Sequence, residues 1–370
     1  MHTLGVDERS ALQNALQRLL ADHSTEAHVR ETMTTTSGYD VSLWQKLAEM
    51  GITGLLIDEQ HGGAGAGPVE IEMVMEEAGA ALLCSPLLAS SVLAAGVLQT
   101  LDDADARTRL LPGIANGSCI ATVALTGVQG TWTEAGVEVQ ATQSGDTWAL
   151  QGTASYVIHG QNAQLLLVVA RTAQGMAVFE VDPASAGISM SPLPTFDHTL
   201  RLARIEFSSV PARLIGSNSN TWSAVEQALN LARVALAGEQ AGGARKMLEI
   251  TIEYAKQRVQ FGRAIGSFQA IKHMAADLLL ESESATSAAR HAAQALADGA
   301  NDADSAVTLA AFACADAFNT VTATSVQMHG GIAFTWEHPA HLYLRRARAD
   351  AQLFGTSGFY RERYVQQLGG

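Results

Sequence analysis

The sequence predicts a multidomain α+β protein in which a central antiparallel β region lies between two helical regions. Two observations lead to this prediction. Before about residue 117 and after about residue 215, apolar residues recur at the three- and four-residue spacing of a buried helix face. Between these limits the chain contains short β-type runs separated by turn residues. We therefore expect an all-α domain over 1–117, a β-barrel or sandwich over 118–214, and a four-helix bundle over 215–370.

The first region shows helical spacing interrupted by glycine and proline. The expected helical segments are one around Leu12, Leu16 and Leu19, followed by 41–50 and 69–98. Pro86 and Pro112 mark breaks, because proline removes a helix hydrogen bond. We interpret the glycine-rich segment 62–67 as a loop rather than as a binding site.

The middle region changes to a strand pattern. The expected strands are 120–125, 137–141, 148–150, 165–169, 177–181 and 202–207. Turn residues such as Gly145 and Pro183 lie between them. Regularly spaced short strands favour a compact antiparallel barrel or sandwich over a parallel sheet.

The last region returns to long helices. The expected segments are 222–258, 267–298, 302–327 and 338–350. Ala, Leu and Val occupy every face of 227–242, which is typical of a helix enclosed in a bundle or a tetramer.

Composition excludes several classes of protein. Apolar residues make up 47% of the chain and charged residues 16%, so disorder is not expected. The net charge of −14 argues against nucleic-acid and membrane-surface binding. No signal peptide or membrane-length apolar run is evident, and the three cysteines have no metal-type spacing, so we expect buried thiols in a cytoplasmic protein. No metal site is predicted, and His159, His329, His338 and His341 are assigned to loop or helix-cap roles.

Two motifs carry the strongest chemical signal. The first, between two long helices, runs from Arg258 through Phe261 to Gln269, and the second runs from Gln327 through Gly330 and Gly331. An arginine can hold a diphosphate through two hydrogen bonds, and glycines let backbone amides approach a phosphate closely. Taken singly, the arginine is also compatible with a cation at a helix end and the glycines with a plain turn.

Together with the α, β, α order, these motifs resemble the acyl-CoA dehydrogenase family over essentially the whole chain. The resemblance implies FAD as cofactor, held across a subunit interface in a homo- or hetero-tetramer. It implies an acyl-CoA substrate and an electron-transfer flavoprotein as partner. It assigns to FAD the residues Arg258, Phe261, Gln269, Gln327, Gly330 and Gly331, with Thr356 in the C-terminal loop.

The β region departs from the family pattern. Thr126 is the residue that matches the family's turn at the flavin and thioester, and Tyr156 stands where the family has a tryptophan. By resemblance both are assigned to FAD, with ordinary sheet packing as the alternative for Tyr156. Ile158 replaces the threonine that hydrogen-bonds flavin N5 in the family, and an isoleucine cannot donate that bond.

The residue that the family uses as its catalytic base is replaced at both of its usual positions. One position is held here by Phe354 and the other by Ala232. Arg233, which follows, resembles the family's arginine near the CoA pocket and is assigned to substrate; an exposed helical arginine is the alternative. Glu239 lies seven residues after Ala232, roughly two turns and about 10 Å along a helix. An acid in such apolar surroundings is either functional or paired, so Glu239 is the candidate base, with a structural ion pair or a pocket floor as alternatives.

Three functions follow from the resemblance. The first is an acyl-CoA dehydrogenase that forms a trans-2-enoyl-CoA in fatty acid or sterol side-chain β-oxidation. The second is a non-catalytic, FAD-binding partner subunit of a heterotetramer. The third is a flavin monooxygenase or acyl-CoA oxidase on the same fold. Chain length and branching of the substrate are not readable from the sequence, and a ring-bearing thioester stays open because Phe354 would crowd the usual site.

Overall fold

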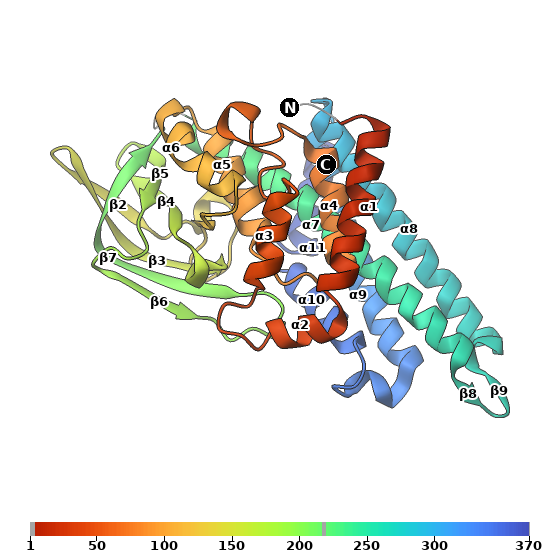
Figure 1. Cartoon of the computed structure of the whole chain (residues 1–370). Helices are drawn as coiled ribbons and strands as arrows, with labels where there is room; N and C mark the ends of the chain where they lie inside the picture. Colours follow the sequence, from red (N-terminus) through yellow and green to blue (C-terminus); the bar gives the residue numbers. More distant parts are fainter. Residues whose placement is uncertain (1–3, 217–219, 370) are drawn as a thin grey trace. The chain divides into compact units, whose positions relative to one another are not determined.

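A computed structural model describes residues 4–216 and 220–369 of the chain (Figure 1). These residues divide into two compact units. Unit 1 contains residues 32–67 and 84–232, and unit 2 contains residues 4–31, 68–83 and those from Arg233 onward. The three predicted domains are continuous segments of the sequence, whereas each unit combines segments that lie far apart in it.

The helices of unit 1 are short. They are η1 (Glu59–His61), η2 (Leu88–Ala94), α3 (Val41–Glu49), α5 (Ala95–Thr100) and α6 (Ala104–Ala115). Among them, α3 and α6 begin at aspartate caps. The Asp40 carboxylate accepts hydrogen bonds from the Ser42 and Leu43 amides and so caps α3. The expected helical segment 69–98 is not continuous: its first helix ends at Ala80, and the chain becomes helical again at Leu88 as a π-helix. Leu82, with φ of 47°, lies in this break.

The sheet of unit 1 closes on itself. Its strands are β1 (Ala121–Ala124), β2 (Gln140–Ser144), β3 (Thr147–Ile158), β4 (Leu165–Thr172), β5 (Gly175–Val181), β6 (Ile188–Pro192) and β7 (Leu202–Ile215). The pairings β2–β3, β3–β7, β7–β5, β5–β4 and β4–β2 form a ring, so the predicted barrel is present. The expected antiparallel pattern holds except where β1 and β2 pair with β4 in parallel. Strand β6, which the sequence pattern did not predict, pairs with β7.

Unit 2 contains the long helices. The long ones are α1 (Val6–His23), α8 (Gln269–Ala297), α9 (Ala303–His329) and α7 (Thr221–Gln257), whose residues from Arg233 onward belong to this unit. The shorter ones are α2 (Glu26–Thr32), α4 (Pro68–Ala80), α10 (Ala340–Asp350) and α11 (Ser357–Gln367). A short hairpin, β8 (Val259–Gln260) and β9 (Arg263–Ala264), joins α7 to α8 at their far ends (Figure 1). Helix α11 was not among the predicted segments.

Small residues bring the helices of unit 2 into close contact. A Cβ added at Gly242 of α7 would lie 1.8 Å from the backbone oxygen of Glu76 in α4. One added at Gly238 would lie 2.5 Å from the backbone oxygen of Glu72. The glycines therefore let the backbones of α4 and α7 touch, which a larger side chain would prevent. Buried alanines fill the contact of α7 with α8 and α9, including Ala241, Ala285, Ala289 and Ala310.

Among the described residues, one helix, Ala303–Phe334, is long and apolar enough by length and composition to cross a membrane. Its apolar side chains, such as Val307 and Phe318, are buried within unit 2. A core helix passes the same test, so this segment needs no membrane to explain its composition. The three cysteines are free thiols, with Cys84 and Cys314 buried as expected and Cys119 half-buried.

Candidate functional site

The first motif forms a hairpin that projects from the ends of α7 and α8. Phe261 and Gly262 form its turn with φ of 54° and 76°. A positive φ at a phenylalanine is uncommon, and here it is held by the β8–β9 pairing and by the Ile265 amide, which donates to Arg258 O at 2.8 Å. The Phe261 ring is 91% exposed, so it is available to a ligand or to another chain.

Side chains behind this turn support it. The Arg263 guanidinium lies 4.0 Å from the centre of the Phe268 ring, and the Phe261 ring meets the same ring edge-on at 6.1 Å. Gln269 begins α8, is exposed, and its amide nitrogen lies 3.0 Å from His273 Nε2. Arg258 is exposed. The hairpin thus presents a cation, an amide and an aromatic ring to solvent.

The second motif forms the end of α9. Gly330 leaves the helix with φ of 67°, and Gln327 is exposed one turn earlier. A Cβ built on Gly330 or Gly331 meets no described atom within 4 Å, so the backbone of this turn faces open space. The turn lies beside the last turns of α7, because Tyr254 Oη donates to His329 O at 3.3 Å. The structure therefore places both motifs at the same end of unit 2.

These residues fit a flavin dinucleotide in their chemistry. An exposed arginine and a glycine turn that faces open space suit a diphosphate, and an exposed aromatic ring suits a planar ring system. Thr356 is exposed as well, but its hydroxyl oxygen accepts the Phe359 amide at 3.3 Å and caps α11. Its assignment to FAD remains a prediction.

The two candidates in the barrel are held by local bonds. Thr126 is buried, and its hydroxyl donates to Thr131 O at 2.7 Å. The hydroxyl proton is therefore not available to hydrogen-bond a ligand. Tyr156 lies in a bulge of β3 with φ of 56°. Its hydroxyl donates to Val128 O at 3.3 Å, and its ring faces Gly130. The Tyr156 ring therefore packs on the 128–130 loop and keeps 36% of its surface exposed.

Both usual positions of the base are apolar and buried. Ala232 and Phe354 are each fully buried, and Phe354 has φ of 60°. Tyr360 Oη donates to Phe354 O, and Arg233 Nε donates to Tyr360 Oη at 3.0 Å. Arg233 is 3% exposed, so the alternative of an exposed helical arginine is wrong. The cavity beside Arg233 and Tyr360 has about 10 Å³ of room, which suits one water molecule at most.

Glu239 forms a buried ion pair. Its carboxylate bonds the guanidinium of Arg346 in α10, and both side chains are 6% exposed. Arg346 also donates to Leu83 O at 3.4 Å. The ion pair that the sequence left open as an alternative is therefore present, and the assignment of Glu239 as base stays a prediction.

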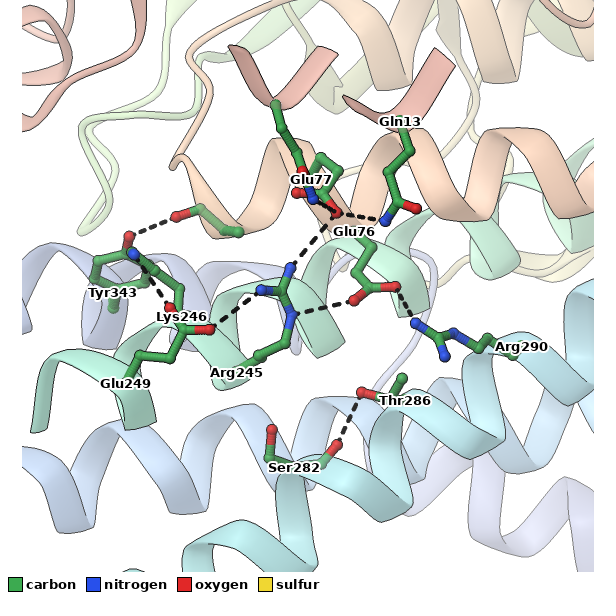
Figure 2. Close-up of polar contacts among 12 residues, drawn as sticks. Gln13, Glu76, Glu77, Arg245, Lys246, Glu249, Ser282, Thr286, Arg290 and Tyr343 are labelled. Carbon is green, nitrogen blue, oxygen red and sulfur yellow. Dashed lines mark hydrogen bonds and ion pairs between the residues drawn. The ribbon is translucent and has the colours of Figure 1, made fainter. Parts of the chain in front are cut away.

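An acidic cluster on α4 was not predicted from the sequence. This helix carries four buried glutamates, namely Glu70, Glu72, Glu76 and Glu77. Figure 2 shows Glu76 between Arg245 of α7 and Arg290 of α8, at 3.2 and 3.1 Å. Glu77 accepts from Gln13 at 2.8 Å. Four acids in an otherwise apolar helix are the sequence signal that could have revealed this network.

Glu72 stands apart from these pairs. Its Oε1 has no hydrogen-bond partner among residues 4–216 and 220–369. Burial, and next the charge of Glu76, raise the pKa of Glu72 to about 8, although Arg290 opposes this. A neutral, protonated carboxyl is therefore the form that suits this site at pH 7.

Comparisons with known proteins agree with this architecture. The model of the acyl-CoA dehydrogenase N-terminal domain matches residues 6–118, and that of the C-terminal domain matches residues 221–369. Acyl-CoA dehydrogenase IpdE2 of Mycobacterium tuberculosis is 36% identical over 349 residues, which cover 94% of this chain and 93% of that protein.

Two solved structures share the fold and over a quarter of the sequence. One is a variant of the Tcur3481-Tcur3483 steroid ACAD, with 31% identity, 98% of each chain covered and a TM-score of 0.88. The other is the ChsE4-ChsE5 complex from Mycobacterium tuberculosis, with 29% identity, 100% of this chain and 99% of that chain covered, and a TM-score of 0.90. This chain therefore belongs to the acyl-CoA dehydrogenase family, whose members are flavin-dependent oxidoreductases acting on CH–CH bonds.

Proposed function

We propose that this chain serves the α,β-dehydrogenation of an acyl-CoA thioester to the trans-2-enoyl-CoA as the FAD-binding subunit of a mixed tetramer. A second kind of subunit supplies the catalytic base. Bound FAD supplies the hydride acceptor for such a reaction. An electron-transfer flavoprotein is the proposed electron acceptor.

The observation that carries this proposal is the state of the base positions. Abstraction of the α-proton needs a base within hydrogen-bond reach of the substrate. Ala232 and Phe354 have no titratable group, and both are fully buried. The nearby acid, Glu239, is bonded to Arg346 and buried with it. A base supplied by another subunit would abstract the α-proton in place of the residues that this chain lacks.

The role proposed for this chain is to hold the cofactor. Arg258 and the Gly331 amide would bind the diphosphate, with Gly330 turning the backbone towards it, while Gln269 and Gln327 would donate to neighbouring polar groups. Phe261, Thr126, Tyr156 and Thr356 are proposed to contact the remainder of FAD, and Arg233 is proposed to act on the substrate side.

The relatives support a two-component assembly. Two of the similar structures carry paired component names, the ChsE4-ChsE5 complex and the Tcur3481-Tcur3483 enzyme. The second is a steroid ACAD, so we propose a ring-bearing acyl-CoA as the substrate class, with a fatty acyl-CoA as the alternative.

Expression of the chain alone and together with a second acyl-CoA dehydrogenase chain tests the proposal. We expect the pair to form a yellow tetramer whose flavin absorbance bleaches on anaerobic addition of an acyl-CoA. We expect the single chain not to bleach. In the pair, Glu239→Gln should leave the bleaching rate unchanged.

A different result would reassign the chain. Bleaching of the single chain at an ordinary rate, abolished by Glu239→Gln, would identify a self-sufficient dehydrogenase with Glu239 as its base. As a matched control, Glu283→Gln alters an exposed glutamate on α8 and should change neither result.

A further inference from the structure

Three aromatic rings gather behind the glycine turn at the end of α9. The His329 ring stacks on Tyr254 of α7, with centres 4.4 Å apart and planes at 29°. The His338 ring lies 4.4 Å from His329 and 6.1 Å from Tyr254. From the sequence the two histidines were expected in separate loop or cap roles, and their contact was not predicted. No group of His, Cys, Asp or Glu among the described residues is suited to a metal ion. We therefore treat Tyr254, His329 and His338 as a cluster of packed rings.

The hydrogen bonds of His329 define its neutral form. Its Nδ1 lies 2.7 Å from the backbone oxygen of Ser325, one turn earlier in α9. A carbonyl oxygen can only accept, so Nδ1 carries the proton and donates. The other nitrogen, Nε2, is buried and has no hydrogen-bond partner in the described part of the chain. A second proton on this ring would therefore add a buried charge without an acceptor.

The cluster also holds the peptide that leads into the turn. Tyr254 Oη donates to the carbonyl oxygen of His329. On the other side of the same peptide, the Gly330 amide donates to Val326 O. Both polar groups of the peptide are thus fixed, which sets the direction in which Gly330 and Gly331 leave the helix.

Burial is the main factor that opposes protonation of the cluster. Burial lowers the pKa of His329. Burial, and next the neighbouring His329 and Arg30, lower the pKa of His338, whereas Glu26 of α2 raises it. For His341, burial and then Arg30 and Arg345 lower the pKa to about 4, again against Glu26. The rings therefore stay neutral at pH 7 and gain charge on acidification.

We propose that His329 is a positioning residue for FAD: its ring cluster with Tyr254 and His338 fixes the His329–Gly330 peptide, and protonation of His329 releases the glycine turn and the cofactor. This inference rests on the proposed binding of FAD by Gly330 and Gly331. It predicts that cofactor affinity depends on a group that never touches the cofactor, and that acid weakens binding.

FAD binding to the purified protein, in the mixed tetramer where that is the stable form, tests this through flavin fluorescence between pH 5 and pH 8. For the wild type we expect the affinity to fall severalfold between pH 7.5 and pH 5, because binding is linked to the loss of a proton that His329 takes up only on acidification. His329→Ala should lower the affinity about tenfold at pH 7.5, because Tyr254 loses the ring on which it stacks and its hydroxyl is no longer held against His329 O. His329→Phe keeps a ring in the stack but cannot titrate, so it should bind FAD at pH 7.5 within about threefold of the wild type and lose most of the acid sensitivity.

His291→Phe is the matched control, since His291 is an exposed histidine on α8 and its replacement should leave the pH profile unchanged. Far-UV circular dichroism establishes whether each variant is folded. If His329→Ala does not fold, the pH dependence of FAD affinity in His329→Phe tests the inference by itself. If the wild type binds FAD and His329→Phe shows the same acid sensitivity, the inference is overturned while the proposed function stands. If no form of the wild type binds FAD, both are overturned.

Discussion

The buried carboxyl of Glu72 should make this protein less stable as the pH rises, which is the opposite of the effect of a salt-bridged carboxylate. Glu72 is 3% exposed, and Oε1 lacks a hydrogen-bond partner within the described ranges. Burial and the charge of Glu76 raise its pKa from 4.5 to about 8. Between these values the folded chain holds a proton that the unfolded chain has released. The stabilisation is therefore fully present below about pH 4.5 and is lost as the pH rises through about 8.

Replacement of Glu72 by glutamine removes this titration while preserving the shape of the side chain. Each unit of pKa shift corresponds to about 1.4 kcal/mol, so the free energy at stake is on the order of 2–5 kcal/mol. At pH 5 glutamine resembles the protonated acid, and we expect Glu72→Gln to match the wild type within about 1 kcal/mol. At pH 9 the variant should be the more stable by on the order of 2–5 kcal/mol.

Urea unfolding followed by far-UV circular dichroism at pH 5, 7 and 9 measures this difference. Glu283→Gln removes the same charge from an exposed position of α8 and should shift no midpoint relative to the wild type. A parallel change of Glu72→Gln and the wild type from pH 5 to pH 9 would show that Glu72 titrates like an ordinary exposed acid, and would refute the raised pKa.

Other substitutions probe the packing, the glycine turn and the former base position. Glu76→Gln removes the charge that pairs with Arg245, and should lower the free energy of unfolding at pH 7 by about 1–3 kcal/mol in a urea titration. Gly242→Ala would place a Cβ 1.8 Å from a backbone oxygen of α4 and should abolish the folded protein, as judged by gel filtration and circular dichroism. Gly331→Ala meets no described atom within 4 Å, so it should preserve the melting temperature of the FAD-free protein and weaken FAD binding in a fluorescence titration. Tyr360→Phe removes a buried hydroxyl that accepts one hydrogen bond and donates another; a loss of about 1–3 kcal/mol in unfolding free energy is expected, and an unchanged midpoint would contradict the hydrogen bonding described here.

Several features of the site are local in sequence and could be predicted from it. The hairpin after α7 needs a turn with positive φ, and Gly262 next to Phe261 supplies it. The end of α9 needs a residue that leaves the helix, and Gly330 supplies that. The loss of both usual bases was also readable, because Ala232 and Phe354 have no titratable group. Each of these features depends on the types of a few consecutive residues, so no distant partner is required to predict it.

Features that depend on partners far along the chain were not readable. Strand β6 is only five residues long, so its apolar and polar alternation is too short to be a clear signal, and its pairing with β7 defines it. Helix α11 has little apolar periodicity and is held against α9 by contacts such as Phe312 with Tyr364. Both elements gain their stability from neighbours rather than from their own residues.

By itself the sequence determined the α, β, α order, the positions of the long helices and the two motifs that identify the family, since periodicity and turn chemistry act over a few residues. Tertiary structure alone decided that Glu239 meets Arg346, that Glu72 is buried without a partner for Oε1 in the described chain, and that Tyr254, His329 and His338 form one cluster. The partner of a buried charge or ring is chosen by which helices pack together, and packing brings together residues that no local pattern relates.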